Sequence, residues 1–354
     1  MENFNSYELS IENLRYNVDK IRSFVGDSKI CAMVKADGYG HGATVITKAI
    51  EDKVDFFGVA SVFEAQELRD AGIKNKILIV GKIPLSCFEW CAENDVSVTV
   101  SSVKEMRQVC DLIHRRLSVH VKVNTGMNRF GINSVEELKK IKKLFSAHPN
   151  IIFEGMFTHF ATKAEDVVFL DAQHVLFDKY IKLVDKNVII HCASTYATSQ
   201  HGLFKHDMVR CGFAIYGWGE GFKPVLSIKS KIISIHDVKR GDSVGYDRTF
   251  VFNDKGKVGV VPIGYADGFD RRLSNNFKVL INGCYVDVIG RICMDVFMVD
   301  LSTVKNVQEG DVVTVLGSDG KNGISVYDYA EALDTSPYEI LLKFRPHRMK
   351  TVLK

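Results

Sequence analysis

Short apolar runs alternate with helical patterns along the first 216 residues of the chain. The apolar runs occupy residues 29–36, 56–60, 76–80, 96–102, 118–125, 151–160, 187–194 and 208–216. They are continuous rather than alternating with polar residues, which is typical of parallel strands covered on both faces. Between the runs, a serine followed three residues later by a glutamate predicts helix starts at Ser61, Ser102 and Ser134, and Gly72 is a predicted helix end.

Eight strands separated by crossover segments predict a (β/α)8, or TIM, barrel in the α/β class. An open, doubly wound parallel sheet is the alternative that the same pattern allows. After about residue 222 the pattern changes to β-type runs at 226–238, 242–252, 257–265, 278–301 and 311–317, separated by turn residues. We therefore predict a barrel domain over residues 1–222, followed by a mainly β C-terminal domain over residues 223–354.

Composition narrows the class of protein. Apolar residues make up 46% of the 354 residues, charged residues make up 25%, and the net charge of +3 is scattered along the chain. This balance is that of a globular protein and shows no nucleic-acid footprint. No apolar run approaches the length of a membrane helix, and the first residues do not resemble a signal peptide. The eight cysteines match no zinc pattern, so we expect free thiols in a reducing cytoplasm and no metal site.

The first strand ends in a cation, in the stretch AMVKADGYGHG at residues 32–42. Functional groups of a barrel gather at the C-terminal ends of its strands, which is where Lys35 falls. A lysine that loses solvation has a lowered pKa and can attack a carbonyl, so a Schiff base with an aldehyde cofactor is one interpretation and a surface lysine is the other. A phosphate on such a cofactor would need donors near the last two strands, where Thr195 and the segment 210–213 lie.

Seven ordered motifs carry a resemblance that covers nearly the whole chain. They are VKADGYGHG, NTGMNRFG, THFA, VRCGFAIYG, VGYDRTF, GYADGF and GRICMD. In this order they resemble the alanine racemase family of fold-type III enzymes that use pyridoxal 5'-phosphate. The resemblance implies interconversion of L-alanine and D-alanine, which supplies D-alanine for the bacterial cell wall.

The resemblance also implies a role for each matched residue. Lys35 would hold the cofactor as a Schiff base and act as one of two bases, and Tyr246 would be the opposite base. His159 would support Tyr246 through hydrogen bonds, and Arg210 would face the pyridine nitrogen. The phosphate would be held by Tyr39, Thr195, Gly212, Phe213 and Tyr338, and the substrate would be contacted by Arg129, Met294, Tyr265 and Cys293. In the family, Tyr246 and the CMD segment come from a partner subunit, so we expect a homodimer with shared active sites.

The chemistry of racemisation agrees with two bases. A single base would return the proton to the face that it left, so opposite faces of the substrate Cα need separate bases. Lysine and tyrosine ordinarily titrate at about 10.4 and about 10, so neighbours must tune them. We expect Arg129, Arg210 and His159 to supply positive potential. Because an arginine keeps its proton, Arg210 should leave the pyridine nitrogen unprotonated and discourage side reactions.

Some positions depart from the family pattern or add to it. Lys122 occupies a position where several relatives carry a carbamylated lysine, which would pair with Arg129 as an anion. Ser194, Cys211, Asn124 and Asn128 replace commoner residues, which leaves substrate preference and turnover open. Serine is an alternative substrate, since a small apolar pocket rejects an added hydroxyl only weakly. A pyridoxal-phosphate-dependent amino-acid decarboxylase and a non-catalytic cofactor-binding protein are the remaining alternatives.

Overall fold

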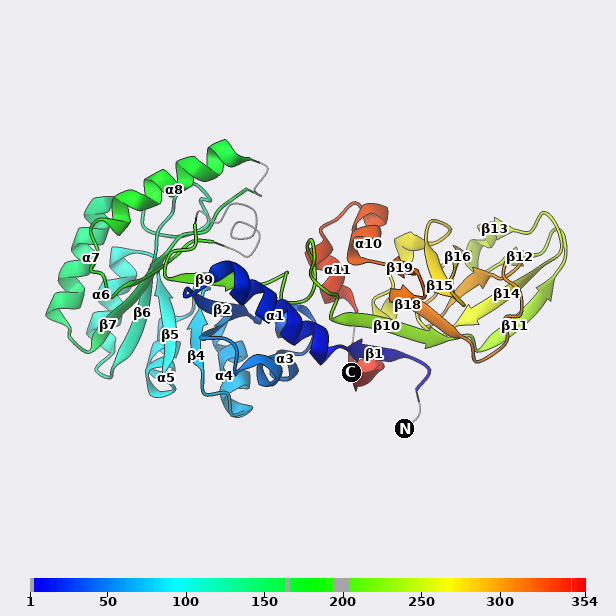
Figure 1. Cartoon of the computed structure of the whole chain (residues 1–354), viewed down its shortest axis with the longest axis horizontal. Coiled ribbons are helices and arrows are strands. Elements are labelled where there is room, and N and C mark those ends of the chain that lie inside the picture. Colours follow the sequence, from blue (N-terminus) through cyan, green and yellow to red (C-terminus); the bar gives the residue numbers. More distant parts are fainter. Residues whose placement is uncertain (1–2, 163–165, 194–203, 345) are drawn as a thin grey trace. The chain divides into compact units, whose positions relative to one another are not determined.

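The computed structural model describes residues 3–162, 166–193, 204–344 and 346–354, and its chain divides into two compact units (Figure 1). The barrel unit comprises Leu14–Gly38 and Gly42–Lys223. The β unit comprises the chain up to Asn13, the short segment Tyr39–His41, and Pro224–Lys354. The chain thus enters the β unit briefly within the glycine-rich stretch that follows the first barrel strand.

Eight strands form the barrel sheet. They are β2 (Lys29–Met33), β3 (Phe56–Val59), β4 (Lys76–Ile79), β5 (Val96–Val100), β6 (Leu117–Lys122), β7 (Ile151–Phe157), β8 (Ile189–His191) and β9 (Met208–Cys211). Each pairs in parallel with its sequence neighbour from β2 to β8, and β9 pairs with β2. The remaining gap, between β8 and β9, is bridged by a hydrogen bond in which the backbone N–H of Arg210 donates to the Ala193 carbonyl at 3.1 Å. The barrel prediction is confirmed, and the doubly wound alternative is wrong because the strand order never reverses.

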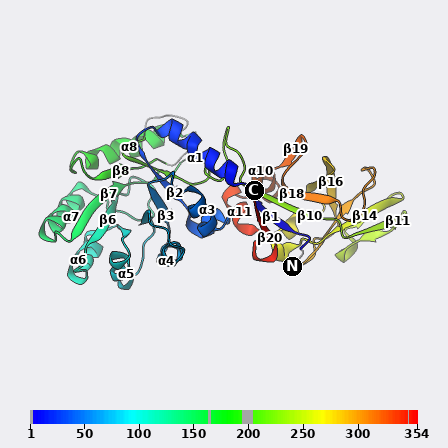
Figure 2. The same ribbon diagram turned by 60° about the horizontal axis from the view of Figure 1, so that its bottom comes forward.

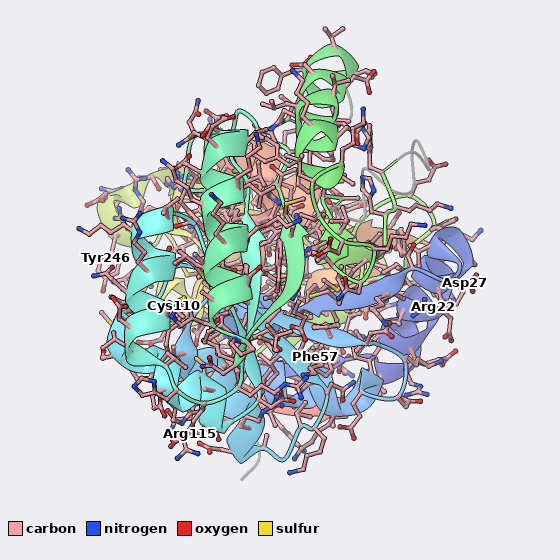
Figure 3. The ribbon with its side chains drawn as sticks, turned by 90° about the vertical axis from the view of Figure 1, so that its left-hand side faces the viewer. Arg22, Asp27, Phe57, Cys110, Arg115 and Tyr246 are labelled. Carbon is pink, nitrogen blue, oxygen red and sulfur yellow. The ribbon has the colours of Figure 1, made fainter. Side chains whose placement is uncertain are left out.

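Helices cover the outside of this sheet, as Figures 1 and 2 show. They are α1 (Ile11–Val25), α3 (Ala43–Ile50), α4 (Val62–Asp70), η1 (Leu85–Cys87), α5 (Phe88–Glu93), α6 (Val103–Leu112), α7 (Val135–Ala147) and α8 (Val167–Ile181). In Figure 3, Phe57 lies among the strands and Arg115 at the periphery of the unit. The side chain of Phe57 is fully buried, and burying such a side chain contributes about 1.5–3 kcal/mol.

Local capping explains where several of these helices begin. Ser61 and Ser134 make the predicted reciprocal capping boxes with the glutamates three residues on. Ser102 also accepts the backbone N–H of Glu105, but the Glu105 carboxylate accepts from Ser101 instead. Gly72, with φ of +87°, follows the end of α4 as predicted. Among the described helices, none is both long and apolar enough to cross a membrane.

The β unit is built on one large sheet and a small hairpin. Its strands are β1 (Ser6–Leu9), β10 (Leu226–Lys231), β11 (Ser234–Val238), β12 (Ser243–Val244), β13 (Phe250–Val251), β14 (Gly256–Val261), β15 (Lys278–Ile281), β16 (Cys284–Ile289), β17 (Phe297–Asp300), β18 (Val312–Asp319), β19 (Asn322–Ile324) and β20 (Lys350–Leu353). β1 pairs antiparallel with β10 and parallel with β20, so the first strand of the chain is part of this sheet.

Two helices of the β unit were not expected from the sequence: α10 (Val326–Leu333) and α11 (Pro337–Lys343). Their start signals are present, however. Ser325 and Asp328 form a capping box, and Ser336 caps a helix whose first residue is Pro337. The β-type runs that precede these helices favour strands, so the sequence pattern predicted an all-β domain. Tyr338, one of the predicted phosphate residues, lies on α11.

Candidate active site

Lys35 follows β2 and begins a left-handed turn, α2 (Lys35–Tyr39). Ala36, Asp37 and Gly38 have φ values of 52°, 52° and 61°, and Tyr39 has 53°. A residue with a Cβ in this conformation costs about 1–2 kcal/mol, so consecutive strained residues mark a functional position rather than an ordinary turn. The Asp37 carboxylate accepts the N–H of Ala43 at 2.7 Å, which fixes the turn to the start of α3.

Arg210, on β9, lies inside the barrel with only 6% of its surface exposed. One terminal nitrogen, Nη1, donates to Nδ1 of His191 at 2.8 Å and to the His191 carbonyl at 3.1 Å. The other, Nη2, donates to the carbonyls of Thr158 and Cys192 and to Nδ1 of His159, at 2.8, 3.1 and 3.2 Å. The guanidinium is therefore held in one orientation by residues at the ends of β7 and β8.

A chain of buried hydrogen bonds runs from Arg210 through the barrel interior. Nε2 of His191 lies 2.8 Å from Nδ1 of His120, and Nε2 of His120 lies 3.1 Å from Oε2 of Glu154. Both histidines are fully buried. Glu154 also accepts from the Ser97 hydroxyl, and Lys76 lies 3.8 Å from its second oxygen.

The donors and acceptors in this series of hydrogen bonds determine which ring nitrogen of each histidine carries the proton. Arginine can only donate, so Nδ1 of His191 must accept and its Nε2 must carry the proton. Nδ1 of His120 then accepts, and its Nε2–H donates to the Glu154 carboxylate. Burial and the charge of Arg210 lower the pKa of His191 well below its usual value, in agreement with a neutral ring. The carboxylate thus fixes the tautomers that hold Arg210.

The backbone of β7 is adapted to this arrangement. Val119 pairs with Phe153 but His120 pairs with Gly155, so Glu154 is the extra residue of a β-bulge. A bulge redirects a side chain, here the carboxylate toward His120. A Cβ on Gly155 would lie 2.3 Å from Nδ1 of His120, so only glycine leaves room for the ring.

We expect Glu154→Gln to lower the free energy of unfolding by about 1.5–3 kcal/mol, because it removes a charged acceptor from a buried network. Burial alone would raise the pKa of Glu154, but the bonds from His120 and Ser97 and the charge of Lys76 lower it to about 2. The stability contributed by the Glu154 carboxylate is therefore fully present above about pH 4.3 and is lost as the pH falls through about 2. Urea denaturation of both proteins should give a difference at neutral pH that shrinks in acid.

The exposed Glu136, on α7, provides the matched control for that experiment. Its side chain is 69% exposed and only 3.6 Å from Lys139, so Glu136→Gln should change stability little. Equal stability of Glu154→Gln and the parent at neutral pH would contradict the fixed-tautomer interpretation.

Four cationic side chains of the barrel unit, Lys35, Lys122, Arg129 and Arg210, lie close enough to influence one another. Burial lowers the pKa of Lys35, and Arg129 and Arg210 lower it further while Glu64 opposes them. Burial, Arg129, Arg210 and Lys35 lower the pKa of Lys122 to about 7. The amine of Lys122 lies 3.5 Å from the centre of the Phe130 ring, an attraction that compensates part of its desolvation. This group of cations can attract an anionic ligand.

His159 differs from the expectation. Burial and the charges of Arg210, Arg129, Lys122 and Lys35 lower the pKa of His159 to about 3, so its ring is neutral near pH 7. The prediction that His159 supplies positive potential is wrong, because it lies among cations and accepts from one of them. With Nδ1 accepting from Arg210, its Nε2–H is left as a donor.

The other predicted residues of the barrel unit follow β9. Gly212 is buried and Phe213 partly buried, in a turn where the N–H of Ile215 donates to the Gly212 carbonyl at 2.8 Å. Thr195, predicted to hold phosphate, lies outside the described residues.

Tyr39 and Tyr338 lie together within the β unit, with ring centroids 6.1 Å apart. Burial raises the pKa of both phenols, so each remains a hydrogen-bond donor. Gly40, between Tyr39 and His41, lies against α11: a Cβ there would come 2.5 Å from the Leu341 carbonyl. Its own carbonyl accepts from Tyr7, on β1, at 2.5 Å. Residues far apart in the sequence are thus brought together here.

Tyr246, Tyr265 and Met294 are exposed on the β unit, by 66%, 42% and 54%. Tyr246 begins η2 (Tyr246–Arg248), where Asp247 and Arg248 have positive φ. Ion pairs with Asp247 hold this turn: Arg291 lies 3.7 Å away and Arg271 4.0 Å.

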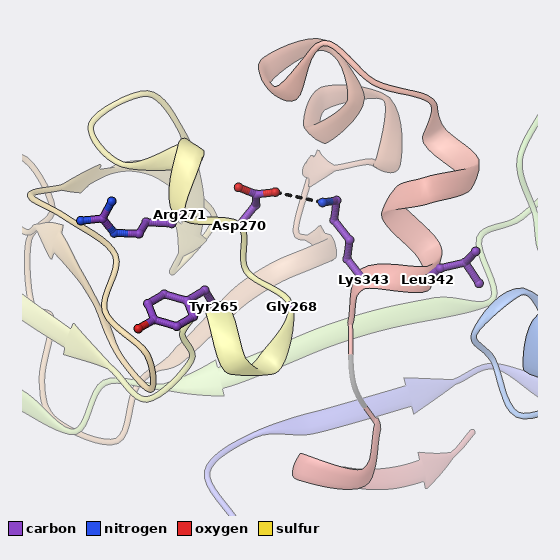
Figure 4. Close-up of a pocket in the computed structure, with 6 residues that line it drawn as sticks. All are labelled: Tyr265, Gly268, Asp270, Arg271, Leu342 and Lys343. Carbon is purple, nitrogen blue, oxygen red and sulfur yellow. Dashed lines mark hydrogen bonds and ion pairs between the residues drawn. The ribbon is translucent and has the colours of Figure 1, made fainter.

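Backbone hydrogen bonds join η3 (Tyr265–Asp267) to the segment of Cys293 and Met294, where the N–H of Tyr265 donates to the Cys293 carbonyl at 3.1 Å. An adjoining hollow of about 530 Å³ is lined by Tyr265, Gly268, Asp270, Arg271, Leu342 and Lys343, which Figure 4 draws as sticks. Asp270 accepts from Lys343 at 2.9 Å across this hollow. Tyr265 therefore has an open face on the surface of its unit.

Sequence reasoning missed His120, Glu154 and His191 as parts of the site. A signal was available, since each is a polar residue within an apolar barrel strand, and such residues are seldom buried without a partner. The sequence did not reveal which polar residues of neighbouring strands would meet.

Comparisons with known proteins agree over both units. The family model for the N-terminal domain of alanine racemase matches residues 9–219, and that for its C-terminal domain matches residues 225–353. Alanine racemase 2 of Caldanaerobacter subterraneus is 36% identical over 351 residues, covering 94% of this chain and 90% of that protein.

Solved structures share the fold. Alanine racemase from E. faecalis matches with a TM-score of 0.94 at 31% identity, over 99% of this chain and 98% of that chain. A histidine racemase from Leuconostoc mesenteroides matches with a TM-score of 0.90 at 27% identity, over 100% of this chain and 98% of that chain.

Proposed function

The chain belongs to the alanine racemase family, and from this we propose that it interconverts L-alanine and D-alanine with pyridoxal 5'-phosphate as cofactor. The observation that carries the proposal is Lys35, held by a strained turn at the end of β2 with a lowered pKa. A lowered pKa leaves more of the amine neutral and able to attack an aldehyde.

The side chains present fit this cofactor. The group of Lys35, Lys122, Arg129 and Arg210 suits a ligand with a phosphate and a substrate with a carboxylate. Tyr39, Tyr338, Gly212 and Phe213, with Thr195, are the proposed phosphate residues, and His159, which lies beside Arg210, would contact the cofactor as well. When bound, pyridoxal phosphate withdraws electrons from the substrate Cα and so makes its proton acidic.

The chain's own residues then move the proton. We propose that Lys35 exchanges it on one face of Cα and Tyr246 on the other. Arg129, Tyr265, Met294 and Cys293 would contact the substrate, and the bulk around Cα would limit the side chain to a small one. The protein acceptors around Nη1 and Nη2 take up the terminal hydrogens of Arg210, so its Nε–H would donate to the pyridine nitrogen, without giving up its proton.

We further propose a homodimer in which one subunit's barrel receives Tyr246 of the partner. The 66% exposure of this tyrosine supports the proposal, because a general base must be shielded from bulk water. The dimer would act in the cytoplasm and supply D-alanine for the bacterial cell wall, with a small amino acid rather than a nucleic acid or membrane as its partner.

Lys122 is a proposed site of carbamylation. With a pKa of about 7, a substantial part of its amine is neutral near pH 7 and can add carbon dioxide with release of a proton. The product would be an anion able to pair with Arg129. Native intact-mass measurement in bicarbonate buffer should show the added mass, and its absence would exclude the modification.

The experiment that tests the function compares racemisation of L-alanine, L-serine and L-histidine by the holoenzyme. We expect kcat/KM to be highest for alanine, with serine within about 10²-fold because a small pocket excludes a hydroxyl weakly. Histidine is included because a histidine racemase shares the fold. A preference for histidine would replace the proposed substrate, and carbon dioxide release without racemisation would favour a decarboxylase.

A further inference from the structure

Three side chains with metal-binding atoms meet between α8 and the strands β8 and β9, apart from the residues of the proposed active site. They are His174 on α8, Cys192 directly after β8, and His206 before β9, and their ligand atoms all lie within 4.8 Å of one another. Nε2 of His174 lies 3.0 Å from Nε2 of His206. Three separate elements are therefore needed to assemble this group.

The group faces away from the barrel interior. The His191 side chain points inward to Arg210, and successive side chains of an extended chain point to opposite faces. Cys192 accordingly points outward, where its thiol donates to the Phe204 carbonyl at 3.5 Å. The Phe204 ring packs against His174 with centroids 4.6 Å apart. A ligand bound here would not compete with one bound at Lys35.

Two further observations point to a ligand. Oδ2 of Asp178, one helical turn after His174, lies 3.7 Å from its Nδ1. A small side-chain rotation would bring the two within hydrogen-bond distance, and a carboxylate that accepts from one nitrogen of a histidine leaves the other nitrogen for a metal, an arrangement typical of metal sites. His206 has a φ of 39°, a strained value for a residue with a side chain, and its carbonyl is held by the Ser28 hydroxyl at 2.8 Å.

We propose that His174, Cys192 and His206 bind one Zn²⁺ ion, with water as the fourth ligand. Two imidazoles and a thiolate are a ligand set that suits zinc and not the hard cations Mg²⁺ or Ca²⁺. Zn–N bonds of about 2.0–2.1 Å and a Zn–S bond of about 2.3 Å require the most distant ligand atoms to approach by about 1 Å, which side-chain rotation supplies. On binding, the Cys192 thiol loses its proton to the buffer and the sulfur bonds to the ion.

The proposed zinc site differs from the expectation of no metal, and the argument for it does not depend on the proposed racemase activity. The sequence gives no zinc spacing because the ligands are 18 and 14 residues apart and come from three elements. One consequence reaches the active site: the carbonyl of Cys192 accepts from Nη2 of Arg210 at 3.1 Å. A bound ion would therefore anchor the same residue that helps to position Arg210.

The first test is calorimetric titration of the holoenzyme with Zn²⁺. We expect one ion per chain, with affinity reduced at least about 10-fold in Cys192→Ala and His174→Gln, and by about 10–100-fold in Asp178→Asn. Cys110→Ala, on α6, and His236→Gln, on β11, are matched controls that should bind like the parent. Failure of the parent to bind one equivalent, or binding unchanged in Cys192→Ala, would overturn the proposal.

A second measurement remains informative if a variant folds poorly. X-ray absorption of the parent loaded with one equivalent of Zn²⁺ should show two nitrogen ligands and one sulfur ligand among its neighbours. A shell without sulfur, or with several sulfurs, would place the ion elsewhere and refute the site. Zn²⁺ should also raise the Tm of the parent and the two controls, because it binds the folded chain, but not that of Cys192→Ala.

Discussion

Replacing Tyr246 with phenylalanine is expected to lower kcat for alanine racemisation by about 10²–10⁴-fold in both directions, the range for loss of a general acid–base group. The change removes only a hydroxyl from a side chain that is 66% exposed on its own unit, so folding should be preserved. Bound cofactor, followed by its absorbance, should be retained. Because each turnover needs both bases, kcat should fall in both directions of the reaction.

The matched control is Tyr285→Phe in the same unit. Tyr285, on β16, is 46% exposed and donates to the Gly323 carbonyl at 2.9 Å, so its loss should leave turnover unchanged. In heavy water, Tyr246→Phe should still exchange the Cα proton of one alanine enantiomer, through Lys35, but not of the other. Unchanged turnover, or exchange lost equally for both enantiomers, would contradict the two-base mechanism.

Replacing Lys35 with alanine should abolish the covalent attachment of the cofactor and lower racemisation by at least about 10²–10⁴-fold, because both an attachment point and a base are lost. Borohydride reduction followed by peptide mapping should label the parent within residues 29–50 and leave Lys35→Ala unlabelled. The exposed Lys48, on α3, supplies the control Lys48→Ala, which should be labelled like the parent. Label that persists in Lys35→Ala would contradict the assignment.

The two variants together test the proposed dimer. If Lys35 and Tyr246 of one site come from different subunits, a heterodimer of the two variants has one site with both changes and one with neither. Random exchange of subunits should restore about a quarter of the parent's sites, since half of the dimers are mixed and each has one intact site. No recovery after proven exchange would show that both residues act within one chain.

Much of the barrel could be predicted from the sequence because its signals are local. A continuous apolar run such as residues 96–100 specifies a strand buried on both faces, and β5 is buried along its whole length. Ser134 and Glu137 specify where α7 begins, through two hydrogen bonds that span three residues. Lys35 could be placed at a strand end for the same reason. The motif order, not the pattern of residues, suggested the family that the comparisons then showed.

The remaining features depend on side chains that meet across strands. The contacts of His120 with His191 and with Glu154 depend on the closure of the barrel and on a bulge at Glu154. Neither feature produces a periodic pattern in the sequence. The neutrality of His159 arises from burial among cations contributed by three strands, β2, β6 and β9, or the loops that follow them. Local hydrogen bonds and the hydrophobic period involve residues that are close in sequence, so they can be recognised from the sequence. Burial, pKa and ligand geometry depend on residues that are distant in sequence, and only the folded structure brings those residues together.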